Sequence, residues 1–416
     1  MHILFVTSEV AGVFKIGGLA DVSLSLPLAL VKKGIHVTVA LPFYKVINAD
    51  GVRGVGELSV DFGGKREIVF LFSKPLGPAG GTLLLFRHPL LNDYNAPGIE
   101  ERFAFYSRAV AALKVPFDII HCHDWHTALV PLLMPASAKT IITIHNLMYQ
   151  GSVAADVIDR LYAPRDLFHI IKSSRGDKVS FLREGLEYAD RITTVSRAYA
   201  KEILHAFRRD AIGNVLQRRR THVSGILNGI DPESWNPQTD IAIGQRYSSK
   251  TVFAVKPRLK ALLQKEIGLP QIHVPLFAFI GRIEPRQKGI DIVIDALGAI
   301  LKKEAMQVVF LGTGDPKTVR KLLDFSKVHK DSVRFIHAFD DTLARKMYAG
   351  ADVLLVPSKF EPCGLTQMIA MAYGTIPLVR ATGGLIDTVT DGVPGFVFNE
   401  YSGRALANAM SRAHTM

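Results

Sequence analysis

The stretch FKIGGLADV, residues 14–22, joins the apolar segment HILFVTSEV to the segment SLSLPLALVKKG. The first segment has the composition of a β-strand, and the second has that of a helix. Gly17 and Gly18 have no side chains, so a ligand can approach the backbone amides where the helix begins. A tight turn is the alternative explanation of a glycine pair. Lys15 adds a positive charge beside the pair and favours a ligand-binding loop.

The same order of strand, loop and helix recurs along the whole chain. The strands are short, nearly continuous apolar runs, as in parallel sheets that helices cover on both faces. They read HILFVTS, IHVTVALP, FDIIHCH, TIITIHN and RITTVS, and then LFAFIGR, MQVVFLG, SVRFIHAF, DVLLVPS and TIPLVRA. A hairpin is expected only near residues 51–86. The pattern predicts the α/β fold class.

The repeat is interrupted once. After SGILNGIDPESWNPQTD, a polar stretch with prolines extends to about residue 270, and PLFAFIGR then begins a new strand. This interruption predicts two domains, residues 1–236 and 237–416. Ligands of open α/β sheets bind at the carboxyl ends of the strands. We therefore expect two Rossmann-like domains that face each other across one cleft.

The composition is that of an ordinary globular protein, with 48% apolar and 21% charged residues among 416. No signal peptide is indicated, because Glu9 interrupts the first apolar run. No apolar stretch is long enough to span a bilayer. Cys122 and Cys363 have no nearby partner for a disulfide or a zinc site. We therefore expect a cytoplasmic protein that does not bind membranes.

The net charge of +12 is compatible with a nucleic acid, a membrane surface or a small polyanion such as a nucleotide diphosphate. The clearest basic run is LQRRRTH, residues 216–222, and it contains no aromatic residue. Such a run is typical of a solvated loop. We expect no nucleic-acid partner, and nucleic-acid binding is the minor alternative.

The stretch IIHCHDWHTAL, residues 119–129, places four polar side chains at the end of a strand. His121, His123, Asp124 and His126 have the residue types of a metal site, but their spacing lacks the pattern of an open tetrahedral site. We therefore expect no metal here. A polar loop that contacts a hydroxyl-rich substrate is favoured, in which Asp124 accepts hydrogen bonds and Trp125 offers a flat face.

A second strand, TIITI, is followed directly by His145 and Asn146. At the carboxyl end of a central strand these residues favour a role in the cleft, with a structural histidine as the alternative. Asn228 lies in GILNGID, where Asn-Gly is also typical of a turn. A turn and a ligand contact remain equally open for Asn228.

Cations follow the first strand of the second half. Arg282, Arg286 and Lys288 lie in GRIEPRQKG, and their charges beside a helix N-terminus suit a diphosphate. A solvated loop is the alternative interpretation.

Two further loops of the second half open helices. The first contains Glu361, and the second contains Thr382, Gly383 and Gly384. Glycine loops and cations in both halves, together with one carboxylate, fit a nucleotide-sugar cleft. They do not fit a nicotinamide dehydrogenase, because no G-x-G-x-x-G follows the first strand, and a Walker lysine motif is also absent from the sequence.

These motifs together resemble those of bacterial glycogen synthases and plant starch synthases. The resemblance covers nearly the whole chain in order. It is carried by MHILFVTSEVAGVFKIGGLADV, HCHDWHTALVP, TIHNLMYQG, YADRITTVS, GILNGID, ADVLLVPSKFEPCGLTQ and RATGGLIDTV. It implies the GT-B fold, in which two Rossmann-like domains close over a cleft.

The resemblance also implies a reaction. Glucose is transferred from ADP-glucose to the non-reducing end of an α-1,4-glucan such as glycogen or starch. The anomeric configuration is retained, and neither a metal nor an organic cofactor takes part. A UDP-sugar glycosyltransferase of the same fold and an inactive glucan-binding module are the alternatives.

Particular roles follow from the motif that contains each residue. Arg282 and Lys288 would neutralise the leaving diphosphate, and Glu361 would contact the glucose. Phe339, in HAFDD, would lie against the nucleobase. The resemblance further implies that His145 and Asp124 assist catalysis, that Lys15, Gly17, Gly18, Asp21, Thr382, Gly383 and Gly384 bind the donor, and that Trp125, Asn146 and Asn228 contact the sugar or acceptor.

The chain departs from the family's pattern at three places. The loop RIEPRQK is one residue longer than the family's commonest spacing. Position 368 is methionine, where many related glycosyltransferases have a second glutamate, and this favours the synthase branch. After GFVFN only EYSGRALANAMSRAHTM follows, so we expect one last helix and no helices that cross back to the first domain.

Overall fold

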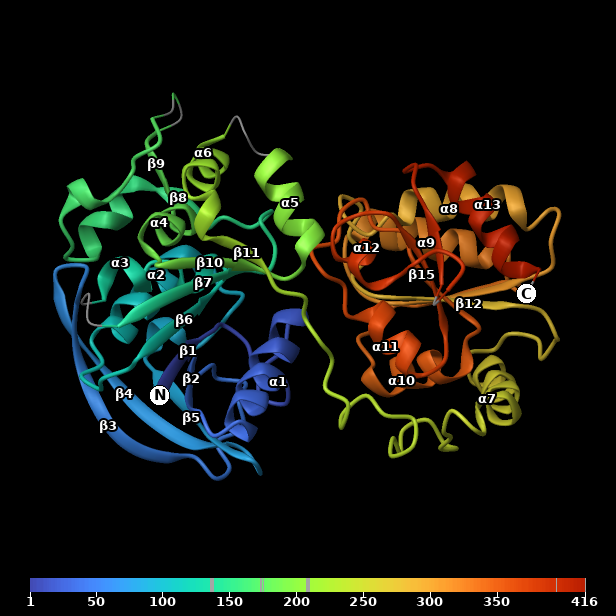
Figure 1. Cartoon of the computed structure of the whole chain (residues 1–416), viewed down its shortest axis with the longest axis horizontal. Coiled ribbons are helices and arrows are strands. Elements are labelled where there is room, and N and C mark those ends of the chain that lie inside the picture. Colours follow the sequence, from blue (N-terminus) through green and yellow to red (C-terminus); the bar gives the residue numbers. More distant parts are fainter. Residues whose placement is uncertain (135–137, 173, 175, 207–209, 394, 416) are drawn as a thin grey trace. The chain divides into compact units, whose positions relative to one another are not determined.

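The computed structural model describes residues 1–134, 138–172, 174, 176–206, 210–393 and 395–415, and it divides into two compact units, Met1–Ile226 and Leu227–Met416 (Figure 1). The division lies before the expected boundary at residues 236 and 237. The reason is that the segment after residue 226 packs on the second unit, where Trp235 lies edge-on against Tyr348, with ring centroids 5.9 Å apart.

The first unit is built on a nine-stranded sheet of order β11-β10-β7-β6-β1-β2-β5-β4-β3. All neighbours are parallel except β3, β4 and β5, which pair antiparallel. The expected hairpin near residues 51–86 is thereby confirmed. The strands are β1 (His2–Val6), β2 (His36–Pro42), β3 (Arg53–Phe62), β4 (Lys65–Gly77), β5 (Gly80–Arg87), β6 (Ile119–His123), β7 (Lys139–Ile144), β10 (Arg191–Thr194) and β11 (Val223–Gly225). A separate two-stranded sheet joins β8 (Ser152–Ala154) to β9 (Lys178–Ser180).

Helices cover both faces of this sheet because successive side chains of each strand point to opposite sides. Leu4 and Val6 pack with α2 and α4, whereas Phe5 packs on the other face with α1. The predicted helix after the glycine pair is confirmed as α1. The helices are α1 (Gly18–Lys32), α2 (Ile99–Ala111), α3 (Val130–Leu133), α4 (Phe181–Tyr188), α5 (Arg197–Ala206) and α6 (Ala211–Arg218).

The second unit contains a six-stranded, wholly parallel sheet of order β14-β13-β12-β15-β16-β17. Counted from its first strand, this is the 3-2-1-4-5-6 order of a dinucleotide-binding fold. The strands are β12 (Leu276–Ile280), β13 (Gln307–Leu311), β14 (Val333–Ile336), β15 (Val353–Val356), β16 (Ile376–Arg380) and β17 (Phe396–Phe398). The predicted α/β class therefore holds for both units.

Two layers of helices enclose the second sheet (Figure 1). α7, α10 and α11 pack on one face with Leu276 and Ala278, and α8, α9 and α13 pack on the other with Phe277 and Phe279. The helices are α7 (Val252–Glu266), α8 (Ile290–Ile300), α9 (Pro316–Val328), α10 (Asp341–Gly350), α11 (Thr366–Ala372), α12 (Gly384–Thr388) and α13 (Gly403–His414). No helix among the described residues is long and apolar enough to cross a membrane.

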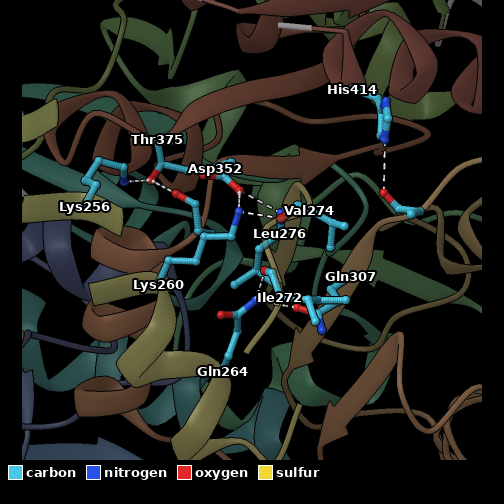
Figure 2. A network of polar contacts seen from close by, with 12 residues as sticks. Lys256, Lys260, Gln264, Ile272, Val274, Leu276, Gln307, Asp352, Thr375 and His414 are labelled. Carbon is cyan, nitrogen blue, oxygen red and sulfur yellow. Dashed lines mark hydrogen bonds and ion pairs between the residues drawn. The ribbon is translucent and has the colours of Figure 1, made fainter. Parts of the chain in front are cut away.

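A polar network attaches α7 to the amino ends of the second sheet's strands, as Figure 2 shows. Lys260 Nζ lies 2.5 Å from Asp352 Oδ2, which also accepts the backbone N–H of Leu276 at 2.7 Å. Lys256 Nζ donates to Thr375 Oγ1 at 2.7 Å and to the carbonyl of Ala349 at 2.9 Å. These bonds join β12, β15 and β16 to one helix at the edge opposite their carboxyl ends.

Each sheet reverses its strand order at one point. In the first unit β1 lies between β2 and β6, and in the second β12 lies between β13 and β15. The chain leaves the carboxyl ends of β1 and β6, or of β12 and β15, in opposite directions, which opens a crevice for ligands in folds of this kind. The loops after these four strands contain Lys15, Gly17, Asp124, Trp125, Arg282, Lys288 and Glu361 of the expected site residues.

Candidate active site

The loop after β1 is shaped by a carboxylate that the sequence analysis did not assign to the site. Glu9 is buried, and its Oε2 accepts the backbone N–H groups of Ile16 at 2.6 Å and Gly17 at 2.7 Å. Burial raises the pKa of Glu9, and the two amides oppose that shift. The sequence signal for this role was a carboxylate three residues after a buried strand. A carboxylate at such a position is expected to be buried, and a buried carboxylate needs specific hydrogen-bond partners.

The expected donor-binding residues of this loop form one ion pair. Lys15 Nζ lies 2.7 Å from Asp21 Oδ1 and 2.9 Å from Oδ2. Asp21 belongs to the first turn of α1, and Gly17 is the residue that caps this helix, without a side-chain hydrogen bond. Gly18 is the first helical residue. Lys15, Gly17, Gly18 and Asp21 therefore meet at one helix N-terminus.

Asp124 follows β6 in a strained backbone conformation, with φ 54° and ψ −173°. It is one of two non-glycine residues with positive φ among the described residues. Its Oδ1 accepts the backbone N–H of His145 at 2.7 Å and that of Asn146 at 3.3 Å. Burial raises the pKa of Asp124 to about 7, against the lowering effect of these two amides. Asp124 thus ties the loop after β6 to the loop after β7.

The histidines near Asp124 are hydrogen-bonded to one another and to hydroxyl groups. His123 Nδ1 lies 2.9 Å from His145 Nε2, His121 Nε2 lies 2.7 Å from Thr143 Oγ1, and His126 Nε2 lies 2.9 Å from the Tyr94 hydroxyl. In the part of the chain that the structure describes, no three His, Cys, Asp or Glu side chains are grouped so that they could hold a metal ion.

Burial also lowers the basicity of these rings. It lowers the pKa of His121 to about 4 and those of His126 and His145 to about 3. All three rings are therefore neutral at physiological pH.

Trp125 does not have the position that the sequence analysis expected. Only 7% of it is exposed, and its ring contacts Phe103, His126 and Phe181. A side chain at Gly151 would place its Cβ 2.4 Å from the indole, so glycine is needed for this packing. The indole belongs to the core of the first unit, and a flat face offered to a sugar is not supported by this position. Asn146 remains on the loop that Asp124 holds.

In the second unit, the loops after β12 and β15 meet in a charged cluster. Lys288 Nζ lies 2.7 Å from Glu361 Oε2, and the Ser358 hydroxyl donates to the same oxygen at 2.8 Å. Glu361 is 6% exposed and Ser358 is 1% exposed. The two residues of the ion pair are 73 positions apart and lie at the point where the sheet reverses its order. Sequence analysis expected both residues and missed Ser358.

Close backbone contacts fix the position of Glu361. The N–H of Gly384 donates to the carbonyl of Glu361 at 3.0 Å. A Cβ on Gly384 would lie 2.4 Å from the Cα of Cys363, and a Cβ on Gly289 would lie 2.1 Å from the carbonyl oxygen of Pro357. Both glycines are therefore required for the approach of their loops to the segment that contains Glu361.

The other expected residues of this unit surround the cluster unevenly. Arg282 is exposed on the loop before Lys288, and Thr382 is buried at the start of the loop to α12. Gly383 has φ 47° and caps α12. Phe339 is 75% exposed just before α10, as a ring that meets a ligand from solvent would be. Asn228 lies near Cys363, through a backbone contact to the thiol.

Arg380 is a further residue that the sequence analysis missed. At the end of β16, its Nε donates to the carbonyl of Ser358 at 2.8 Å, and a second nitrogen donates to the carbonyl of Lys359. Arg380 therefore holds the segment that leads to Glu361. Nothing in the local pattern indicated this contact, because the partners are backbone carbonyls of another loop.

Comparison with known proteins adds the family context. Residues 2–218 match the family described as starch synthase catalytic domain, and residues 274–415 match glycosyl transferases group 1. The glycogen synthase of Thermodesulfovibrio yellowstonii is 39% identical over 99% of this chain and 90% of its own length. Glycogen synthase 2 of Geobacter metallireducens is 40% identical over 99% and 91% of the two chains.

Solved structures agree with this assignment of fold. The catalytic domain of starch synthase IV from Arabidopsis thaliana, bound to ADP and acarbose, superposes with a TM-score of 0.91 and 31% identity, over 100% of this chain and 91% of that one. Sucrose-phosphate synthase from Thermosynechococcus elongatus has a TM-score of 0.62 at 21% identity, over 99% and 89% of the two chains, and shares the fold alone.

Proposed function

Because this chain belongs to the glycogen synthase and starch synthase family and has the GT-B glycosyltransferase fold, we propose that it transfers glucose from ADP-glucose to the non-reducing end of an α-1,4-glucan with retention of configuration. The observation that carries the proposal is the Lys288–Glu361–Ser358 cluster at the order reversal of the second sheet. The Arabidopsis starch synthase IV domain was solved with ADP, which supports an ADP-linked donor.

The cluster has the charges that the reaction needs. The glycosidic bond breaks with negative charge developing on the diphosphate, so preorganised cations there stabilise the transition state more than the bound substrate. Lys288 and Arg282 supply those cations. The glucose ring becomes oxocarbenium-like, and a carboxylate beside it offsets the positive charge. Glu361 has this role, and Ser358 and Lys288 hold its Oε2 so that Oε1 faces the sugar.

The first unit contributes hydrogen-bonding groups in this proposal. Lys15 and Asp21 at the start of α1 contact the donor, and the loop of His145 and Asn146 contacts its sugar. Asp124 keeps that loop in place through the amides of both residues. We propose that neither a metal nor an organic cofactor takes part. The proposal is supported by the absence, among the described residues, of any three His, Cys, Asp or Glu side chains grouped to hold a metal ion. We further propose that the protein acts in the cytoplasm.

The experiment that tests the function measures glucose incorporation into glycogen from radiolabelled ADP-glucose and UDP-glucose in parallel, with and without a chelator. We expect incorporation from ADP-glucose that the chelator does not reduce. Incorporation from UDP-glucose alone would instead support the alternative glycosyltransferase. Incorporation from neither donor would support a glucan-binding module.

The role of Glu361 is tested in the same assay. Glu361→Gln should lower kcat by about a hundredfold or more, because it replaces a charge by a dipole next to a developing cation. Glu284→Gln is the matched control, since it removes a carboxylate from the loop of Lys288. In the part of the chain that the structure describes, this carboxylate accepts the backbone N–H of Arg286 alone. The control should retain normal kcat, and near-normal turnover of Glu361→Gln would rule out the proposed role.

The shared role of Arg282 and Lys288 is tested by a double-mutant cycle. Both cations act on one diphosphate, so the losses from Arg282→Ala and Lys288→Ala should be non-additive, with the double variant little worse than the worse single one. Strict additivity of the two losses in kcat/KM would mean that the residues serve separate sites.

A further inference from the structure

A pair of histidines in the first unit shares a single hydrogen bond. β6 ends at His123, β7 lies beside it, and His145 directly follows β7. His123 Nδ1 lies 2.9 Å from His145 Nε2. The His123 ring is fully buried and stacks on Phe5, with centroids 3.9 Å apart and an interplanar angle of 27°. The contact is therefore held in a fixed geometry.

Each of the two rings carries one proton. Burial holds the pKa of His123 well below its ordinary value, and the neighbouring His121 and His145 lower it further. The pKa of His145 is lowered to about 3, chiefly by burial. A neutral imidazole has one N–H donor and one bare acceptor nitrogen. In the shared bond, one ring must donate and the other must accept.

The surroundings of His123 decide the direction of the bond. Its second nitrogen, Nε2, is buried and has no hydrogen-bond partner among the described residues. A proton on Nε2 would leave a buried N–H without an acceptor, and such groups are rarer in proteins than buried acceptors without a donor. The proton of His123 therefore belongs on Nδ1, where His145 Nε2 accepts it.

We infer that His123 is a positioning residue that donates from Nδ1 to His145 Nε2 and thereby keeps the proton of His145 on Nδ1. His145 then presents a neutral N–H donor to an oxygen of the sugar, and not a bare nitrogen. The role of His145 as a base on a sugar hydroxyl is excluded by this tautomer. This inference rests on the proposed function, which places His145 at the donor glucose.

Two substitutions of His123 separate positioning from packing. Asn has an amide nitrogen at the same bond distance from the backbone as Nδ1, so His123→Asn can still donate to His145. His123→Leu cannot donate, but it fills the apolar space beside Phe5 better than Asn. We expect His123→Asn to be the less stable variant with kcat within about threefold of the wild type, and His123→Leu to be the more stable variant with kcat reduced about tenfold, as for one lost hydrogen bond.

A matched control removes a neighbouring histidine that does not bond to His145. His121 packs beside the same Phe5, at 5.2 Å between centroids, but its Nε2 bonds to Thr143. His121→Leu should keep kcat near the wild-type value. If kcat instead follows stability across these three variants, His123 is a packing residue and the inference is wrong.

The tautomers themselves are read from long-range ¹H–¹⁵N spectra of the full-length protein labelled at histidine, assigned with the variants above and His145→Ala. We expect His123 and His145 both to carry the proton on Nδ1, and His145 to lose this preference in His123→Leu. A proton on Nε2 of His145 in the wild type would overturn the inference. If His145→Ala leaves kcat unchanged while the spectra are as expected, the proposed role of His145 at the sugar fails and the tautomer assignment stands.

Discussion

At the scale of residues, burial of Asp124 disfavours the charged form of a carboxylate that accepts two backbone amides. Its raised pKa of about 7 lies above the value of about 4 expected in the unfolded chain. Between these two values the folded state binds the proton more tightly, so the free energy of unfolding falls as pH rises from about 4 to about 7 and stays low above that. Above about pH 7 the charged form accepts the amides of His145 and Asn146.

Asp124→Asn removes this titration and keeps an oxygen for both amides, and asparagine tolerates a positive φ better than most residues. Relative to the wild type, the variant should gain unfolding free energy between pH 4 and 7, by about 4 kcal/mol at the plateau. Urea unfolding at a series of pH values measures the difference. The exposed Asp166→Asn serves as control and should follow the wild type, and parallel curves for Asp124→Asn and the wild type would contradict the prediction.

At the scale of elements, the side chains of two lysines, Lys256 and Lys260, attach α7 to the second sheet. Lys256 Nζ donates to Thr375 Oγ1 (Figure 2). It also donates to the carbonyl of Ala349 at 2.9 Å, and two further carbonyls lie 3.4 Å away. Lys256→Met keeps the length of the side chain but removes the donor that these acceptors share. We expect the free energy of unfolding to fall by about 2 to 3 kcal/mol, measured by urea, with kcat unchanged because the network lies at the amino edge of the sheet.

The matched control for this helix is Lys346→Met, which removes the partly exposed ion pair between Lys346 of α10 and Glu266 of α7. It should cost less than about 1 kcal/mol. The pH dependence gives a second check, because burial lowers the pKa of Lys256 to about 7. Above pH 7 Lys256 therefore binds fewer protons in the folded wild type than in the unfolded chain, so the free energy of unfolding of the wild type rises with pH. Lys256→Met lacks this rise, and the difference in unfolding free energy between the two proteins should widen from pH 7 to pH 10. Equal losses of unfolding free energy in the two variants would show that the burial of Lys256 adds nothing to the stabilisation.

The whole molecule consists of two units with separate cores, and each contains one of the two tryptophans of the chain. Trp125→Phe leaves Trp235 as the only reporter, in the second unit, and Trp235→Phe leaves Trp125 in the first. We expect urea unfolding followed by tryptophan fluorescence to give different midpoints for the two reporters. ADP at about a hundred times its Kd should stabilise the unit of Trp235 by about 3 kcal/mol, because the cations for the diphosphate belong to it.

The first unit provides the internal control of that experiment, since ADP should move the Trp125 transition much less. Coincident transitions with equal shifts would mean that the chain unfolds as one cooperative unit, and a shift of the Trp125 transition alone would place the diphosphate contacts in the first unit.

Local features of the sequence determined the fold class and the position of most strand ends. Runs such as HILFVTS and LFAFIGR are nearly continuous apolar segments, and such segments form buried parallel strands wherever they lie in the chain. The hairpin from β3 to β5 was also readable locally, but from its turn residues. Its first turn has Gly63 and Gly64, both with positive φ, which a two-residue turn between twisted strands requires.

The tertiary structure alone decided which of these strand ends meet. Lys288 and Glu361 were each expected from their motifs, but their contact depends on β12 and β15 being neighbours, and strand order is set by long-range packing that no local period records. Arg380 was missed because its partners are backbone carbonyls of another loop. Ser358 and Glu9 bond within their own loops, to Glu361 and to the amides of Ile16 and Gly17, but these contacts form only once each loop has folded. Trp125 has the residue type of a sugar platform, yet it is buried, because the space between Phe103 and Phe181 is defined only after α2 and α4 have packed on the sheet.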